Sequence, residues 1–179
     1  MERGRDSRGK GPDVTGHVIH LSTSINASPE AVWDVLTDLP HAADILRSVK
    51  SAELLSEGEY DVGTTWREDR TFFGHHGQEE LHVTESEPPR RTIHETKVGH
   101  DKIRTAYSIQ PASDGGTKLL LTVTIDMSER TQRERLLWNT WGNISFEQTK
   151  KVLEQDLEDI GTEAERRSAD VPGRHASPS

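Results

Sequence analysis

The sequence predicts an α+β fold in which a curved antiparallel sheet of about seven strands packs against one long C-terminal helix. Segments of alternating apolar and polar residues follow one another with short connections, and short connections join antiparallel neighbours. An amphipathic helical pattern interrupts them after the first strand, at residues 28–39. A much longer helical pattern begins at Thr131, after the last strand.

Composition allows one folded domain and excludes several classes of protein. The chain has 179 residues, of which 31% are hydrophobic and 30% charged, a size typical of one domain. Its formal charge of −9 and its lack of a Lys/Arg run argue against binding to nucleic acid or to an anionic membrane surface. The absence of cysteine excludes disulfides and thiolate catalysis. No segment approaches the roughly 20 apolar residues of a membrane span, so we expect a cytoplasmic protein without stable membrane insertion, either a monomer or a homodimer.

The two ends of the chain differ from its middle. Residues 1–16 and 162–179 are polar and lack periodicity, which is typical of disordered segments. We therefore expect a disordered arm, a folded unit over residues 17–161 and a disordered tail. The apolar content is low for a unit of this length, which would be natural if part of the interior were a cavity.

A strand and an amphipathic helix open the folded unit. Residues 17–26 alternate between apolar and polar side chains. Ser28 is a good N-cap, and Pro29 suits the first helical position because its missing N–H leaves no hydrogen bond unmade. Pro40 ends this helix, and residues 41–46 are predicted to form a second short one. The apolar stripe of the first helix comprises Val32, Val35, Leu36 and Leu39.

Six further strands are predicted by alternation between turn residues. They span residues 49–55, 64–73, 78–87, 92–98, 102–110 and 118–127. Glycines at both ends of residues 74–77 predict a hairpin turn there. The clearest core consists of the apolar faces of the last two strands, which are Ile103, Thr105, Tyr107 and Ile109, and Leu119, Leu121, Val123 and Ile125.

The closing helix has a start signal and a stop signal. Thr131 and Glu134 form a capping box, and Gly161 is expected to end the helix. Gly142 lies in the middle, where it could mark a kink. The apolar stripe of this helix contains Phe146, Thr149, Leu153, Leu157 and Ile160.

Four stretches resemble the START-like, or SRPBCC, superfamily. They are INASPEAVWDVLTD (25–38), VGTTWR (62–67), ESEPPRR (85–91) and GGT (115–117). Together with the order of the elements, they are most similar to the polyketide cyclase/dehydrase-like branch, over nearly all of the folded unit. The resemblance implies the helix-grip fold, in which the curved sheet grips the C-terminal helix and encloses a cavity for a hydrophobic or aromatic small molecule.

The resemblance leaves three functions open, because one fold hosts many activities. The superfamily includes aromatic polyketide cyclases, lipid carriers, hormone receptors and regulators of a heat-shock chaperone. The leading hypothesis is a cyclase or dehydratase that needs no cofactor. The alternatives are a non-catalytic carrier or sensor that uses the same cavity, and a protein-interaction module in which the cavity is incidental.

The third predicted strand offers a candidate catalytic arginine. One of its faces carries Trp66, Glu68, Arg70 and Phe72, and aromatic residues at both ends favour this face as the inner one. Arg70 could then hold a ligand carbonyl or carboxylate, with Glu68 as its counter-ion, and its position resembles that of a cavity arginine in aromatic polyketide cyclases. Arg67, on the other face, is the rival, and an exposed ion pair is the alternative role.

His94 and Tyr107 complete the candidate catalytic set. Burying Glu95 and Lys97 without partners would cost several kcal/mol, so we expect their strand to turn Thr92, His94 and Thr96 inward. An imidazole in an apolar cavity can act as a general base or acid, although a structural histidine or the opposite register is the alternative. Tyr107 lies on a core face, where its hydroxyl needs a partner or a ligand.

Several large apolar residues are candidate ligand contacts. Trp33, Trp138 and Trp141 belong to the opening and closing helices, which border the cavity mouth in this fold, and packing in the core is their alternative role. Nine histidines, including the adjacent His75 and His76, show no spacing typical of a metal site, so we expect no metal. Further residues expected to line the cavity are Val83, Leu121 and Val123.

Overall fold

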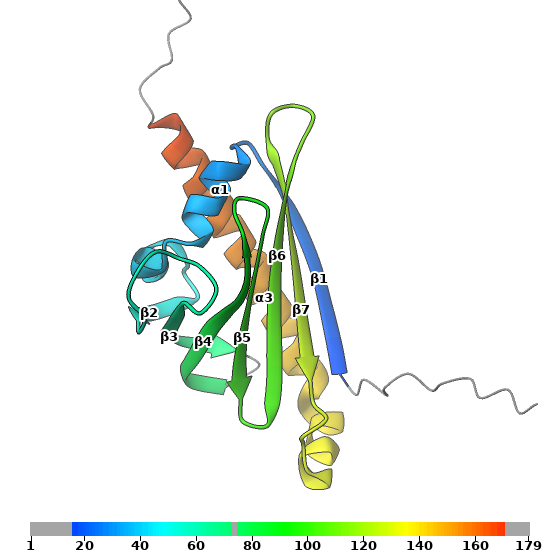
Figure 1. Ribbon diagram of the computed structural model, residues 1–179. Coiled ribbons are helices and arrows are strands. Elements are labelled where there is room, and N and C mark those ends of the chain that lie inside the picture. Colours follow the sequence, from blue (N-terminus) through cyan, green and yellow to red (C-terminus); the bar gives the residue numbers. More distant parts are fainter. Residues whose placement is uncertain (1–15, 73–74, 171–179) are drawn as a thin grey trace, which may run out of the picture.

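The computed structural model describes residues 16–72 and 75–170, apart from the side chains of residues 71, 72, 75, 76, 132 and 134–145. Its elements, in order, are β1 (Gly16–Ile25), α1 (Pro29–Leu36), the 3-10 helix η1 (Leu39–His41), α2 (Ala42–Ile45), β2 (Val49–Leu54), β3 (Thr65–Phe72), β4 (His75–Glu87), β5 (Arg91–Val98), β6 (Asp101–Pro111), β7 (Thr117–Asp126) and α3 (Gln132–Ala169). The strands form one antiparallel sheet in the order β1-β7-β6-β5-β4-β3-β2. The long helix α3 crosses one face of this sheet (Figure 1). The predicted helix-grip fold is therefore confirmed.

The helix α1 is capped as its sequence predicts. The backbone N–H of Ala31 donates to Oγ of Ser28 over 3.3 Å, and Pro29 is the first helical residue. The helix packs on α3, and η1 and α2 then lead to the edge strand β2. The main hydrophobic core lies between α1, α3 and the strands β1, β6 and β7, with Val32 and Leu119 completely buried.

The predicted helix stop at Gly161 is wrong, because α3 continues to Ala169. A Cβ atom on Gly161 would lie 3.4 Å from Cγ1 of Ile25 on β1. This glycine therefore packs against Ile25 within the helix instead of ending it. The expected tail at 162–179 is helical as far as Ala169, and the side chain of Glu134, half of the predicted capping box, lies outside the described residues.

The predicted hairpin turn at 74–77 is also wrong in part. Strand β4 begins at His75, which pairs with Phe72 on β3, and the pairing continues through His76 and Gly77. The backbone hydrogen bonds of a continued ladder outweigh the turn preference of Gly77. Within the described parts of the chain, no helix is long and apolar enough to span a membrane.

Candidate functional site

A pocket lies between the sheet and the helices. Its cavity volume is about 70 Å³. This is several times the roughly 10–15 Å³ that one water molecule needs. The sheet side is formed by β3, β4, β5 and β6, and the opposite side by α1, η1, α2 and α3. The helical side is mainly apolar, with Val35, Leu36, Leu39, Ile45, Leu153 and Ile160.

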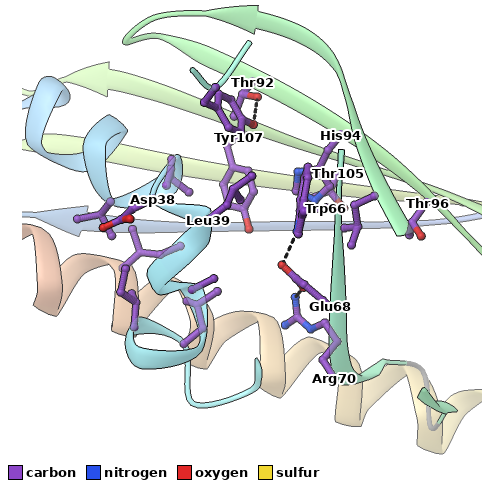
Figure 2. Close-up of a pocket in the computed structure, with 18 of the residues that line it drawn as sticks. Asp38, Leu39, Trp66, Glu68, Arg70, Thr92, His94, Thr96, Thr105 and Tyr107 are labelled. Atoms are coloured by element: carbon purple, nitrogen blue, oxygen red, sulfur yellow. Dashed lines mark hydrogen bonds and ion pairs between the residues drawn. The ribbon is translucent and has the colours of Figure 1, made fainter. Parts of the chain in front are cut away.

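Strand β3 places three predicted residues along one wall of this pocket. Trp66, Glu68 and Arg70 all line it, as predicted, because alternate residues of a strand share a face. The indole Nε1 of Trp66 donates to Oε1 of Glu68 over 2.7 Å, and Nη1 of Arg70 lies 3.5 Å from Oε2 of Glu68 (Figure 2). The rival Arg67 lies on the outer face, where it pairs with Glu80 over 2.6 Å. The side chain of Phe72 lies outside the described residues.

Arg70 is held by a second carboxylate that the sequence reading missed. Its Nη2 lies 2.5 Å from Oδ2 of Asp156 on α3 and 2.8 Å from Oγ of Ser48, which also donates to Asp156. Burial alone would lower the pKa of Arg70, but Asp156 and Glu68 outweigh it and raise this pKa. A signal for Asp156 did exist, because its position falls in the apolar stripe between Leu153 and Ile160.

His94 and Tyr107 lie next to each other on the sheet side, and both line the pocket (Figure 2). The ring of His94 meets the Trp66 ring edge-on, with 5.2 Å between centroids, and lies 6.0 Å from the Tyr107 ring. Among the described residues, no hydrogen bond reaches the His94 ring or the Tyr107 hydroxyl. The register predicted for β5 is confirmed, since Thr92 and Thr96 also line the pocket.

Burial sets the protonation of both rings. Burial, together with the positive charge of Arg70, lowers the pKa of His94 to about 3, so the imidazole is neutral near pH 7. One of its nitrogens can then donate a hydrogen bond and the other can accept one. Burial and the nearby Asp156 carboxylate raise the pKa of Tyr107, so its hydroxyl remains a donor.

Glu79 on β4 is a functional candidate that the sequence reading missed. Its carboxyl is half-buried at the pocket, and its Cα is paired directly opposite Glu68. No hydrogen bond or ion pair joins it to any side chain that the structure describes. Burial raises the pKa of Glu79 to about 7, against the opposing effect of Arg70. Its alternation with Leu81 and Val83 was a usable signal for an inward-facing carboxyl.

Three predicted ligand contacts are instead packing residues. Leu121 and Val123 are buried in the main core and do not line the pocket. Val83 packs with Leu39, Trp66 and Leu81 in a second cluster and does not line the pocket itself. Alternation placed these side chains on the inner face, but there they pack against other apolar side chains.

Trp33 does not line the pocket itself but contacts Tyr60, which does. It is 9% exposed and meets the Tyr60 ring edge-on, with 6.0 Å between centroids. Tyr60 itself lines the pocket, and its hydroxyl lies 2.6 Å from Oγ1 of Thr92. No sequence signal points to Tyr60, because it lies in a loop without periodicity. The side chains of Trp138 and Trp141 lie outside the described residues.

The pocket therefore combines an apolar wall with groups that can move or hold a proton. Glu79 can accept and return a proton near neutral pH. Neutral His94 and Tyr107 can donate hydrogen bonds to an oxygen atom on which negative charge develops. In the part of the chain that the structure describes, no group of three or more His, Asp or Glu side chains could hold a metal ion.

Comparison with known proteins identifies the family. The family model described as polyketide cyclase/dehydrase and lipid transport matches residues 17–165. No curated protein matches the sequence.

Solved structures share the fold at low sequence identity. The Zhui aromatase/cyclase from Streptomyces sp. R1128 has a TM-score of 0.70 and 18% identity, covering 88% of this chain and 99% of that one. A START superfamily protein from Mycobacterium smegmatis has a TM-score of 0.59 and 17% identity, covering 87% and 99%. The di-domain ARO/CYC BexL from the BE-7585A biosynthetic pathway has a TM-score of 0.63 and 16% identity, covering 91% of this chain and 51% of that one. The chain belongs to the polyketide cyclase/dehydrase and lipid transport family of START-like proteins, with the ligand-binding pocket of that fold between its sheet and its closing helix.

Proposed function

We propose that the protein binds an aromatic, polyketide-like small molecule in this pocket and catalyses its cyclisation or dehydration with pocket side chains alone. The observation that carries the proposal is the contrast between the two sides of the pocket. The helical side is apolar, whereas Glu79, His94 and Tyr107 present polar groups for which no described residue supplies a hydrogen bond. Buried polar groups are normally satisfied, so a ligand with polar substituents on an aromatic frame fits both sides.

A dehydration can be written with these groups. Glu79 removes the proton from a carbon next to a carbonyl, and His94 and Tyr107 donate hydrogen bonds to the enolate oxygen that results. The bond between the hydroxyl group and the carbon on the other side of the deprotonated carbon then breaks, and a carbon–carbon double bond forms. Glu79 returns its proton to the leaving hydroxyl, which departs as water. The substrate loses one water molecule, and every side chain ends in its starting state. The pKa of Glu79 suits this role better than that of His94, because proton transfer is most efficient near the working pH.

The second candidate function is a carrier or sensor that does not change its ligand. It is favoured by the state of Arg70, whose guanidinium already pairs with Asp156 and Glu68. An arginine balanced by two carboxylates polarises a ligand carbonyl less than a free one. The third hypothesis, a protein-interaction module with an incidental cavity, is less favoured because the pocket exceeds the size of a single water molecule.

The test combines binding with turnover. Naphthalene diols should quench the tryptophan fluorescence of the protein, and a linear poly-β-ketone thioester should lose the mass of water when incubated with it. We expect His94→Ala, Glu79→Gln and Arg70→Ala to abolish this loss. The outward-facing controls His82→Ala and Arg67→Ala should keep it.

Two results would decide against catalysis. Unchanged turnover in both His94→Ala and Arg70→Ala would exclude the catalytic version of the proposal. A ligand that copurifies unchanged in native mass spectrometry, with no conversion of added substrates, would establish the carrier.

A further inference from the structure

The sheet side of the pocket has more carboxyl groups than cationic groups among the described residues. Glu68 and Asp156 pair with a single guanidinium, that of Arg70, through contacts of 3.5 Å and 2.5 Å. Glu79 adds a third carboxyl without a cationic partner among the described residues. The aromatic residues Trp66 and Tyr107, which line the same pocket, contribute no charge.

A fourth carboxylate at the pocket, that of Asp38, does not change this balance. It lies on the helical side, where Nη2 of Arg167 approaches it to 2.7 Å and Nδ1 of His41 to 2.6 Å. Its charge is therefore compensated outside the pocket. The unbalanced charge remains at the Glu79 end.

We propose that the pocket selects uncharged or cationic ligands that donate a hydrogen bond to Glu79, and that it rejects ligands whose polar end is a carboxylate. This inference rests on the proposed function and names the substrate class of the same pocket. A phenol, an enol or an amine on an aromatic frame fits it. An aromatic or fatty carboxylate does not.

The physical reason is the low polarity of the surroundings. A ligand carboxylate in the pocket would meet Glu68 and Glu79, which lie opposite each other on neighbouring strands, and like charges in a desolvated site repel strongly. Arg70 cannot compensate this charge fully, because Asp156 and Glu68 already engage it. A donor such as a hydroxyl instead supplies the hydrogen bond that the Glu79 carboxyl lacks.

The selectivity should depend on pH. Glu68 and Arg70 on β3 act directly on the Glu79 carboxyl. His94 on β5 and Tyr107 on β6 line the same pocket, and Asp156 on α3 pairs with Arg70. Of these, His94 stays neutral and Tyr107 stays protonated in the neutral range. As the pH falls through the pKa of Glu79, about 7, its carboxyl becomes neutral and can donate to a carboxylate.

Three matched probes test the proposal: 2-naphthol, 2-naphthylmethylamine and 2-naphthoate. At about pH 8, we expect the alcohol and the amine to bind at least about tenfold more tightly than the carboxylate, measured by isothermal titration calorimetry. Glu79→Gln should reduce the difference to less than about threefold by strengthening naphthoate binding. Glu80→Gln removes the same charge from the next residue, on the outer face, and should leave the difference unchanged.

The outcomes separate this inference from the proposed function. If no naphthalene probe binds, the proposed function fails, and this inference fails with it. If naphthoate binds the wild-type protein as tightly as naphthol, or if Glu79→Gln and Glu80→Gln act alike, the charge selection is overturned while the pocket remains a binding site. Naphthoate binding that strengthens between about pH 8 and pH 6 in the wild type, but not in Glu79→Gln, would support the inference.

Discussion

Nη2 of Arg70 and Oδ2 of Asp156 lie 2.5 Å apart in a buried ion pair that joins the sheet to the closing helix. The two residues are separated by 86 positions in the sequence, and Ser48 bonds to both. The Asp156 side chain is 2% exposed and that of Arg70 13%. This pair therefore fixes the position of α3 against the polar wall of the pocket.

Removal of the Asp156 charge should destabilise the protein strongly. Asp156→Asn removes the nearer carboxylate from the buried guanidinium of Arg70, and breaking one partner of a buried pair costs about 3–5 kcal/mol. Urea unfolding measures this free energy. Glu154→Gln, an exposed position on the same helix, should change it by less than about 0.5 kcal/mol. Equal effects of the two substitutions would contradict a structural role for the pair.

Tyr107→Phe should separate stability from function. The Tyr107 hydroxyl has no hydrogen-bond partner among the described residues, so its loss should cost less than about 0.5 kcal/mol of unfolding free energy. Binding of 2-naphthol should weaken several-fold in calorimetry. In the matched variant Tyr60→Phe, loss of the 2.6 Å bond to Thr92 should cost about 1 kcal/mol. A Tyr107→Phe variant as unstable as Tyr60→Phe would argue for a structural hydroxyl.

Ionisation of Glu79 should lower stability as the pH rises. Its pKa is about 7 in the folded protein and 4.5 when unperturbed, so the folded state holds the proton more tightly. The stabilisation is fully present below about pH 4.5 and is lost as the pH rises through about 7. Because solvent screens the half-buried carboxyl, we expect a loss on the order of 1 kcal/mol.

The measurement for Glu79 is a difference between variants. Urea unfolding of wild type and Glu79→Gln at about pH 5 and about pH 8 isolates this group from the other titrating residues. The wild type should lose more stability between the two values than Glu79→Gln does. Glu80→Gln should follow the wild type, and parallel pH dependence in the wild type and Glu79→Gln would refute the raised pKa.

Two histidines should titrate differently in one NMR experiment. Burial and Arg70 lower the pKa of His94 to about 3, so its ring signals should not move between about pH 5 and pH 8. The hydrogen bond that the His41 ring donates to the Asp38 carboxylate raises the pKa of the exposed His41 above 6.5, so its signals should move within this range. A His94 midpoint near that of His41 would show that its ring is hydrated or paired with an acid.

Gly161→Ala should stabilise the protein by about 0.5–1 kcal/mol, because alanine is the better helix former. The new methyl group would meet Cγ1 of Ile25 at 3.4 Å, an ordinary contact. By contrast, a Cβ atom on Gly116 would lie 2.7 Å from the carbonyl oxygen of Ile25, so Gly116→Ala should destabilise. Thermal unfolding compares the two variants, and a loss of stability in Gly161→Ala would show that the new methyl group clashes with Ile25.

Local patterns in the sequence were sufficient to predict most helices and strands and to divide the residues of each strand between its two faces. The Ser28-Pro29 start of α1 depends on groups one turn apart. The alternation along β3 was enough to turn Trp66 and Arg70 inward, because a strand has a period of two residues. The end of α3 was misread, since a glycine that packs against Ile25 and a glycine that ends a helix look alike in sequence.

The sequence by itself therefore determined the fold and the two faces of each strand, whereas the tertiary structure decided which face of β3 and β5 turns inward and which inner residues form the pocket. Leu121 and Tyr107 both face inward and pair directly across β6 and β7, yet only Tyr107 reaches the pocket. The pairing of Glu79 with Glu68, and of Asp156 with Arg70, depends on strand register and on where α3 lies. The pKa values that suit Glu79 to proton transfer and keep His94 neutral follow from burial, which arises only when distant segments exclude water together.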